Sequence, residues 1–144
     1  PFEATQLLRG MRTLFLRVRQ SSQSAQHIAE TLLSHNAVSE VLYPGLLDFP
    51  GHDIAVRQMK DGFGGMVSIR LKAGEAAAIA TAAHVQLWHR ATSLGGVESL
   101  LEHRGSIEGA GSPVPLDLLR LSVGIEDPED LISDLNDALN RATT

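Results

Sequence analysis

Leu119-Arg120-Leu121-Ser122-Val123-Gly124 is an alternating apolar run that carries a single arginine. Alternation with a period of two is typical of a strand with one buried face. A guanidinium stays protonated in proteins, and an unpaired charge away from water is costly. Arg120 therefore needs an anion, either a carboxylate of the protein or one of a ligand. The planar guanidinium suits bidentate binding of a carboxylate in both cases.

Further strands and helices are predicted on both sides of this run. Val38 to Tyr43 and Met66 to Lys72 alternate as strands, and Val85 to Ser93 contains another strand. The sequences of 52–59 and 75–83 predict helices, the second because it is rich in alanine. Strands that alternate with helices are typical of a parallel sheet, so pattern alone leaves the strand directions open.

The last helix carries the clearest boundary signal in the chain. Asp127 is expected as its N-cap and Pro128 as its first residue. Its apolar residues recur at helical spacing and predict a single buried stripe. The members of that stripe are Leu131, Ile132, Leu135, Ala138 and Leu139.

The composition excludes several classes of protein. The chain has 144 residues, a net charge of −5 and no cysteine, so we expect neither a nucleic-acid surface nor a disulfide framework. Its apolar stretches are too short to span a bilayer. His84 and His89 have no acidic partner at zinc-ligand spacing, so no metal site is expected. We expect a cytoplasmic protein.

Several segments together carry a family resemblance. The stretch 93–100, which is Ser-Leu-Gly-Gly-Val-Glu-Ser-Leu, is followed by Glu102-His103 and by 119–127. These segments resemble the C-terminal domain of the Cys/Met-metabolism enzymes that use pyridoxal phosphate. The family includes cystathionine γ-synthase, cystathionine γ- and β-lyases and methionine γ-lyase. Segments 1–14 and 62–66 match as well, so the resemblance spans essentially the whole chain.

The resemblance implies an α/β fold with two layers (α+β). It is the C-terminal small domain of a fold-type I (aspartate aminotransferase-like) pyridoxal-phosphate enzyme, with an antiparallel sheet of about four strands and helices packed on one face. A long N-terminal helix precedes the sheet. We expect residues 1–36 to form this linking helix, bent near Ser21-Ser22, and residues 37–144 to form the small domain. The helix either packs wholly on its own domain or packs its first half on a large domain outside this chain. The resemblance favours the second arrangement.

Pyridoxal-phosphate chemistry requires a lysine, which this chain does not supply in a suitable setting. Its two lysines, Lys60 and Lys72, are expected to be solvated and lie outside anything similar to the family's lysine motif. We therefore expect no catalytic and no cofactor-binding residue in this chain. The resemblance implies that the absent large domain binds pyridoxal 5'-phosphate and that the fragment alone is inactive.

The resemblance assigns substrate recognition to three residues. Arg120 corresponds to the arginine that binds the α-carboxylate of the amino-acid substrate, and Ser93 to the serine that helps to hold it. A serine that caps its own turn is the alternative for Ser93. Thr92 takes a position that varies among subfamilies and brings no charge to it. In segment 106–110 the chain departs from many relatives, and we expect Glu108 to be exposed.

Two classes of function remain after this comparison. The first is a domain of a trans-sulfuration enzyme, a C–S lyase or γ-synthase of sulfur amino acids, which works as a homotetramer built from two dimers. The second is a free-standing ligand-binding or interaction module that has kept the fold. Segments 93–100 and 119–127 favour the enzyme, with an amino acid and the large domain of the same chain as its partners.

Overall fold

A five-stranded sheet forms the centre of the protein in a computed structural model that describes residues 1–109 and 111–143. The strands follow the order β1 (Val38–Leu42), β2 (Met66–Leu71), β5 (Leu118–Ser122), β4 (Leu100–His103) and β3 (His89–Arg90). The first four are antiparallel to their neighbours, as expected. The strand that the sequence did not predict is β4, and the two-residue strand β3 pairs parallel with it, so the sheet is mixed rather than purely antiparallel.

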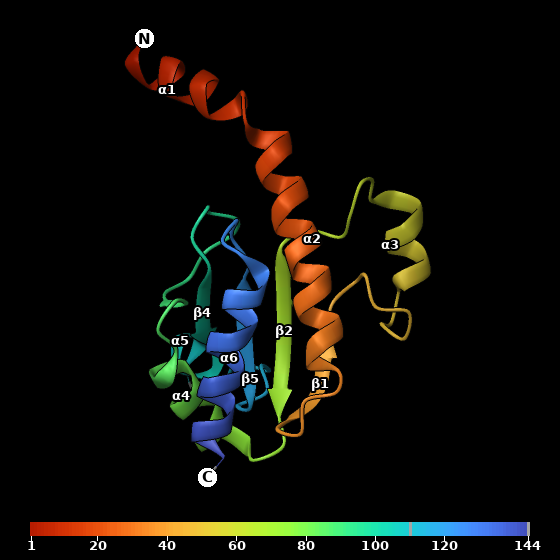
Figure 1. Cartoon of the computed structure of the whole chain (residues 1–144), viewed down its shortest axis with the longest axis vertical. Helices are drawn as coiled ribbons and strands as arrows, with labels where there is room; N and C mark the ends of the chain where they lie inside the picture. The colour runs from red at the N-terminus through yellow and green to blue at the C-terminus, as the bar shows by residue number, and fades with distance from the viewer. Residues whose placement is uncertain (110, 144) are drawn as a thin grey trace.

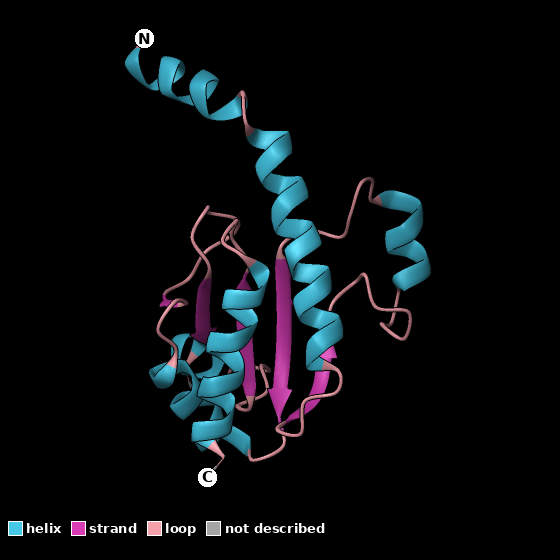
Figure 2. Cartoon of the chain, viewed as in Figure 1, coloured by secondary structure: helices cyan, strands magenta, loops and turns pink. Residues whose placement is uncertain are grey.

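Three helices cover one face of this sheet. They are α2 (Leu14–Leu32), α4 (Gly74–His84) and α6 (Pro128–Ala142), and α2 and α6 lie side by side across the strands in Figure 1. The short helices α3 (His52–Gln58) and α5 (Arg104–Glu108) bury no residue of their own. Figure 2 shows the resulting two layers, with helices on one side and strands on the other.

The hydrophobic core lies between these two layers. Alternate residues of β5, Leu119 and Leu121, are fully buried and point toward the helices. The predicted stripe of α6 is buried in full: Leu131, Ile132, Leu135, Ala138 and Leu139. Asp127 caps α6 by accepting the backbone N–H of Glu129 at 2.9 Å. The capping and the periodicity of this helix are therefore confirmed.

The N-terminal region differs from the single bent helix that we expected. Helix α1 (Phe2–Met11) ends before Arg12 and Thr13, and α2 then begins at Leu14 and ends at Leu32. The helical segment is therefore interrupted at Arg12-Thr13, whereas α2 runs without a break through Ser21-Ser22, where we expected a bend. Arg17 of α2 donates to the Gly10 carbonyl at 2.8 Å, which satisfies an orphan acceptor at the end of α1. In Figure 1, α1 extends away from the sheet.

The sheet presents its other face without a cover from these three helices. Strand geometry places every second residue there, including Arg70 of β2, Glu102 of β4 and Arg120 of β5. This face carries these charged side chains beside Met66, Leu100 and Leu118, and we call it the polar face because the opposite face packs on the apolar core. Across residues 1–109 and 111–143, no helix combines the length and the apolar character needed to span a bilayer.

Candidate functional site

Arg120 lies in the middle of β5 on the polar face of the sheet. Its strand partners are Ser68 of β2 and Glu102 of β4. The neighbouring Leu119 and Leu121 point into the core, so alternation forces Arg120 to the opposite side. The Arg120 side chain is 18% exposed. Its guanidinium is thus shielded from most of the solvent, as the apolar run predicted.

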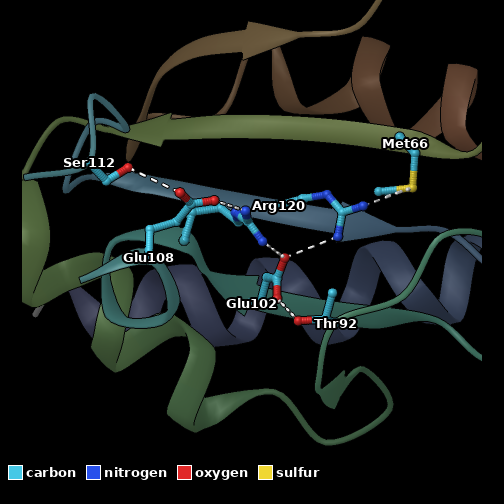
Figure 3. A network of polar contacts seen from close by, with 7 residues as sticks. Met66, Thr92, Glu102, Glu108, Ser112 and Arg120 are labelled. Carbon is cyan, nitrogen blue, oxygen red and sulfur yellow. Dashed lines mark hydrogen bonds and ion pairs between the residues drawn. The ribbon is translucent and has the colours of Figure 1, made fainter.

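One protein carboxylate binds one corner of the Arg120 guanidinium. Nη1 donates to Oε1 of Glu102 at 3.0 Å, while Nη2 has only the sulfur of Met66 at 3.9 Å (Figure 3). Among the residues that the structure describes, Nε of Arg120 makes no hydrogen bond. The side edge formed by Nε and Nη2 is therefore free of any carboxylate within this part of the chain.

Arg70 shows what the same edge looks like when a carboxylate fills it. Its Nε and Nη2 donate to the two carboxylate oxygens of Asp117 at 3.0 and 3.1 Å. Arg70 and Arg120 lie on neighbouring strands and on the same face of the sheet. Of these two arginines, Arg120 is the one whose bidentate edge holds no carboxylate.

Glu102 is the centre of the network in Figure 3. Its side chain is only 4% exposed, and its Oε1 also accepts Nη1 of Arg104 at 2.8 Å. Its Oε2 accepts the hydroxyl of Thr92. Arg104 in turn donates to Glu108, which accepts the hydroxyl of Ser112 at 3.2 Å. Both oxygens of the buried carboxylate are therefore occupied.

Two opposing effects act on the pKa of Glu102. Desolvation by burial raises it, whereas hydrogen bonds from Thr92, Arg104 and Arg120 lower it. The hydrogen bonds prevail, so the pKa of Glu102 lies below its ordinary value. The residue is accordingly a carboxylate at neutral pH, which suits it to pair with two arginines.

The structure links two of the three predicted site residues. Thr92 is joined to Arg120 through the Glu102 carboxylate. Ser93 follows Thr92 in sequence, but its hydroxyl accepts the backbone N–H of Gly96 at 3.3 Å. Ser93 thus caps its own turn, which is the alternative that the sequence left open. A hydroxyl that accepts one hydrogen bond still has its proton to donate.

Sequence reasoning assigned no role to Glu102 or Arg104. A charged residue within the apolar run Leu100-Leu101-Glu102 was the available signal, by the same logic that singled out Arg120. Glu108 is exposed, as expected, and its carboxylate accepts hydrogen bonds from Arg104 and Ser112. Ala110 of the divergent segment lies outside the described residues. His103 accepts the backbone N–H of Ser106 and contacts the Leu116 carbonyl at 2.6 Å, so its ring holds α5 in place.

The two lysines of the chain lie on its surface in the part that the structure describes. Lys60 and Lys72 are both exposed. Lys60 lies between α3 and β2, and Lys72 follows the end of β2, outside the network around Glu102. A cofactor lysine needs an enclosed setting that lowers its pKa or holds its bound partner. Neither lysine has one here.

A family model described as "Cys/Met metabolism PLP-dependent enzyme" matches residues 1–140. The cystathionine gamma-synthase of Mycobacterium tuberculosis is 52% identical over 144 residues, and the match covers 96% of this chain and 37% of that protein. The cystathionine gamma-lyase of Saccharomyces cerevisiae is 44% identical over 153 residues, with 99% and 39% covered. The chain thus spans less than half the length of these relatives.

Solved structures of cystathionine gamma-synthase and gamma-lyase are also similar to this chain. The cystathionine gamma synthase of Xanthomonas oryzae pv. oryzae, in complex with aminoacrylate and cysteine, superposes with a TM-score of 0.91 at 45% identity. That match covers 99% of this chain and 39% of the other. The yeast cystathionine gamma-lyase superposes with a TM-score of 0.86 at 42% identity, covering 94% and 37%.

Proposed function

The chain belongs to the family of Cys/Met metabolism PLP-dependent enzymes, and on this premise we propose that it is the domain that binds the substrate carboxylate. The complete protein would be a trans-sulfuration enzyme of the cystathionine γ-synthase or lyase type. Pyridoxal 5'-phosphate is the cofactor of the family. Because Lys60 and Lys72 are exposed, we assign the cofactor to a large domain outside this chain.

The free side edge of Arg120 is the observation that supports this proposal. An amino-acid substrate brings an α-carboxylate, and two parallel N–H donors bind such a group in a defined orientation. Nε and Nη2 of Arg120 offer that pair, since Glu102 occupies Nη1 alone. Orientation of the substrate matters because a reacting bond must be aligned before it can break. The role of Arg120 is thus binding and positioning.

Ser93 is the second member of the proposed carboxylate site. Its hydroxyl accepts the Gly96 N–H and keeps its proton for an acceptor. Its neighbour Thr92 is tied to Glu102, so the loop that carries Ser93 is fastened to the network that holds Arg120. A hydroxyl and a guanidinium edge together would bind both oxygens of one carboxylate.

The relatives set the order in which reactions are tested. Proteins described as cystathionine gamma-synthase reach 52% identity, whereas one described as L-methionine gamma-lyase reaches 44%. We therefore propose γ-synthase activity first and lyase activity second for the complete protein. The site residues of this chain recognise a carboxylate and do not by themselves separate the two reactions.

The proposal also accounts for the exposed apolar side chains of the N-terminal helices. Large apolar side chains of α1 and of the first turns of α2 are exposed, with Phe2 at 72% and Phe15 at 82%. The second half of α2 is buried in the core, including Ala25 and Ile28. We propose that residues before Ser22 pack on the large domain of the same polypeptide, since exposed apolar faces of this size mark contact surfaces.

Arg120→Ala in the full-length enzyme tests the proposed role. We expect kcat/KM for the amino-acid substrate to fall by about 100-fold or more, with a strong rise in KM, because charge-assisted hydrogen bonds are lost. Arg70→Ala is the matched control, since it removes an arginine from the same face whose bidentate edge Asp117 already fills. Unchanged kinetics in Arg120→Ala would refute the assignment.

The 144-residue chain alone provides a second test. We expect no turnover of cystathionine or methionine when pyridoxal 5'-phosphate is added to it, because neither lysine is enclosed. Turnover by the chain alone would contradict the division of labour between two domains. The proposal further includes a homotetramer, which sedimentation of the full-length enzyme would test. It also includes a cytoplasmic location, which cell fractionation would test.

A further inference from the structure

We propose that Glu102 is the positioning residue of the carboxylate site and that Thr92 and Arg104 hold it in place. The inference rests on the proposed function of Arg120 and adds a residue that acts through it. Glu102 contacts Arg120 and would not contact the substrate. Its effect is to fix which edge of the guanidinium is presented.

The single contact to Arg120 determines which edge remains open. Glu102 binds Nη1 only, at 3.0 Å, so the guanidinium plane is fixed at the corner opposite its side edge. A bidentate contact such as that between Asp117 and Arg70 would have closed the side edge instead. A flexible arginine without this contact would sample several rotamers, and small misplacements of a positioning group reduce rates strongly.

Three separate segments determine the direction of the Glu102 carboxylate. Thr92 comes from the loop after β3, Arg104 from the start of α5, and Arg120 from β5. Two of these contacts converge on Oε1 and the third takes Oε2. Because Oε1 is shared between two arginines, Glu102 cannot turn both oxygens toward Arg120 without losing Arg104 and Thr92.

Arg104 is itself held from the side away from Glu102. It donates to Glu108, and Glu108 accepts the hydroxyl of Ser112 at 3.2 Å. Arg104 is 23% exposed and Glu102 only 4%, so the chain of contacts runs from Ser112 and the surface of α5 to a nearly buried carboxylate. Figure 3 shows these side chains in one continuous row that ends at Met66. These contacts restrict the side chain of Glu102 to one orientation.

The test compares two ligands in the full-length holoenzyme. L-Norleucine carries an α-carboxylate and no leaving group, and pentylamine is the same molecule without the carboxylate. Binding of each is followed by the absorbance of the bound cofactor. For Glu102→Ala we expect the Kd of norleucine to rise about tenfold or more, as is typical when a charge-assisted hydrogen bond is lost. The Kd of pentylamine should stay within about twofold, since only the carboxylate site is disturbed.

Two further variants separate positioning from a general loss of structure. Glu102→Gln keeps an oxygen that accepts Nη1 of Arg120, so its loss of norleucine affinity should be smaller than that of Glu102→Ala. Asp117→Asn removes the charge and one of the two acceptor oxygens from a carboxylate–arginine pair on the same face and should alter neither Kd. Equal weakening of both ligands in Glu102→Ala, or no weakening in either Glu102 variant, would overturn the inference. If Glu102→Ala does not fold, Glu102→Gln and Thr92→Val carry the same comparison.

Arg120→Ala measured beside these variants keeps the two proposals apart. If Arg120→Ala does not selectively weaken norleucine, the proposed function itself fails. If Arg120→Ala does so while the Glu102 variants bind norleucine normally, only the positioning role of Glu102 fails.

Discussion

Ser99 donates both its backbone N–H and its hydroxyl to the carboxylate of Glu126, and both donor–acceptor distances are 2.7 Å. The hydroxyl oxygen of Ser99 also accepts the backbone N–H of Gly124 at 2.8 Å. Ser99 is fully buried and ends the loop that carries Thr92 and Ser93. These bonds therefore fasten that loop to the segment that follows β5, the strand of Arg120.

Ser99→Ala should reduce the free energy of unfolding by about 1–3 kcal/mol, because it leaves the Gly124 N–H without an acceptor and Oε2 of Glu126 without its donor, while the backbone N–H of residue 99 still donates to Oε1. Urea denaturation of the chain measures the effect. Ser34→Ala is the control, since the Ser34 hydroxyl is exposed and bonds only within its own turn. That variant should stay within about 0.5 kcal/mol of the wild type. Equal effects of the two substitutions would contradict the importance of the buried contacts.

Gly124→Ala should destabilise the protein for steric reasons. An added Cβ would lie 2.2 Å from the Val97 carbonyl oxygen and 2.8 Å from the backbone of Glu98, so the chain must shift. Overpacking of this kind costs about 1–3 kcal/mol, and the melting temperature should fall accordingly. Gly10→Ala, where nothing lies within 4 Å of the new atom, should cause no loss. A wild-type melting temperature in Gly124→Ala would show that the segment yields without strain.

Asp127→Ala removes the side-chain cap of α6 and should cost about 1 kcal/mol of stability. The carboxylate of Asp127 accepts the Glu129 N–H at 2.9 Å, and alanine has no acceptor for this N–H. Asp137→Ala provides the comparison within the same helix, because Asp137 is exposed and lies away from the ends. Alanine favours helix interiors, so that variant should lose nothing. The prediction fails if both variants unfold at the same urea concentration.

The stability difference between wild type and Glu102→Gln should depend on pH. The pKa of Glu102 is lowered from 4.5 in the folded protein, so its ionised form stabilises the fold. That contribution is present above the unfolded pKa of 4.5 and is lost as the pH falls through the lowered pKa. Urea midpoints of both proteins should therefore differ most near neutral pH and converge in acid. A difference that stays constant with pH would show that the charge of Glu102 is not responsible.

Local signals in the sequence predicted helix α6 and strands β1, β2 and β5. These elements combine a clear hydrophobic period with their own boundary residues, so little depends on distant parts of the chain. The break between α1 and α2 was missed because Arg12 and Thr13 are neither glycine nor proline. Strand β3 (His89–Arg90) lies within the predicted segment 85–93, whereas β4 was missed. A run of four residues such as β4 carries too little alternation to be distinguished from a loop.

The candidate site was only half predictable for a related reason. Arg120 attracts attention because a charge interrupts an apolar run, and that is visible in the sequence alone. Its partner depends on which residue of β4 lies opposite, and strand register is decided by packing across the whole sheet. Glu102 and Arg104 could therefore not be assigned to Arg120 before the pairing of β4 with β5 was known.

The pairing of Glu102 with Arg120 across β4 and β5 has a consequence for folding. A slip of one residue between β4 and β5 would turn Arg120 toward the apolar layer and bring Leu101 or His103 opposite it. The misaligned sheet would bury a cation with no counter-ion, which is heavily disfavoured. The Glu102–Arg120 pair thus favours the correct register of β4 and β5 and destabilises sheets in which the two strands are misaligned.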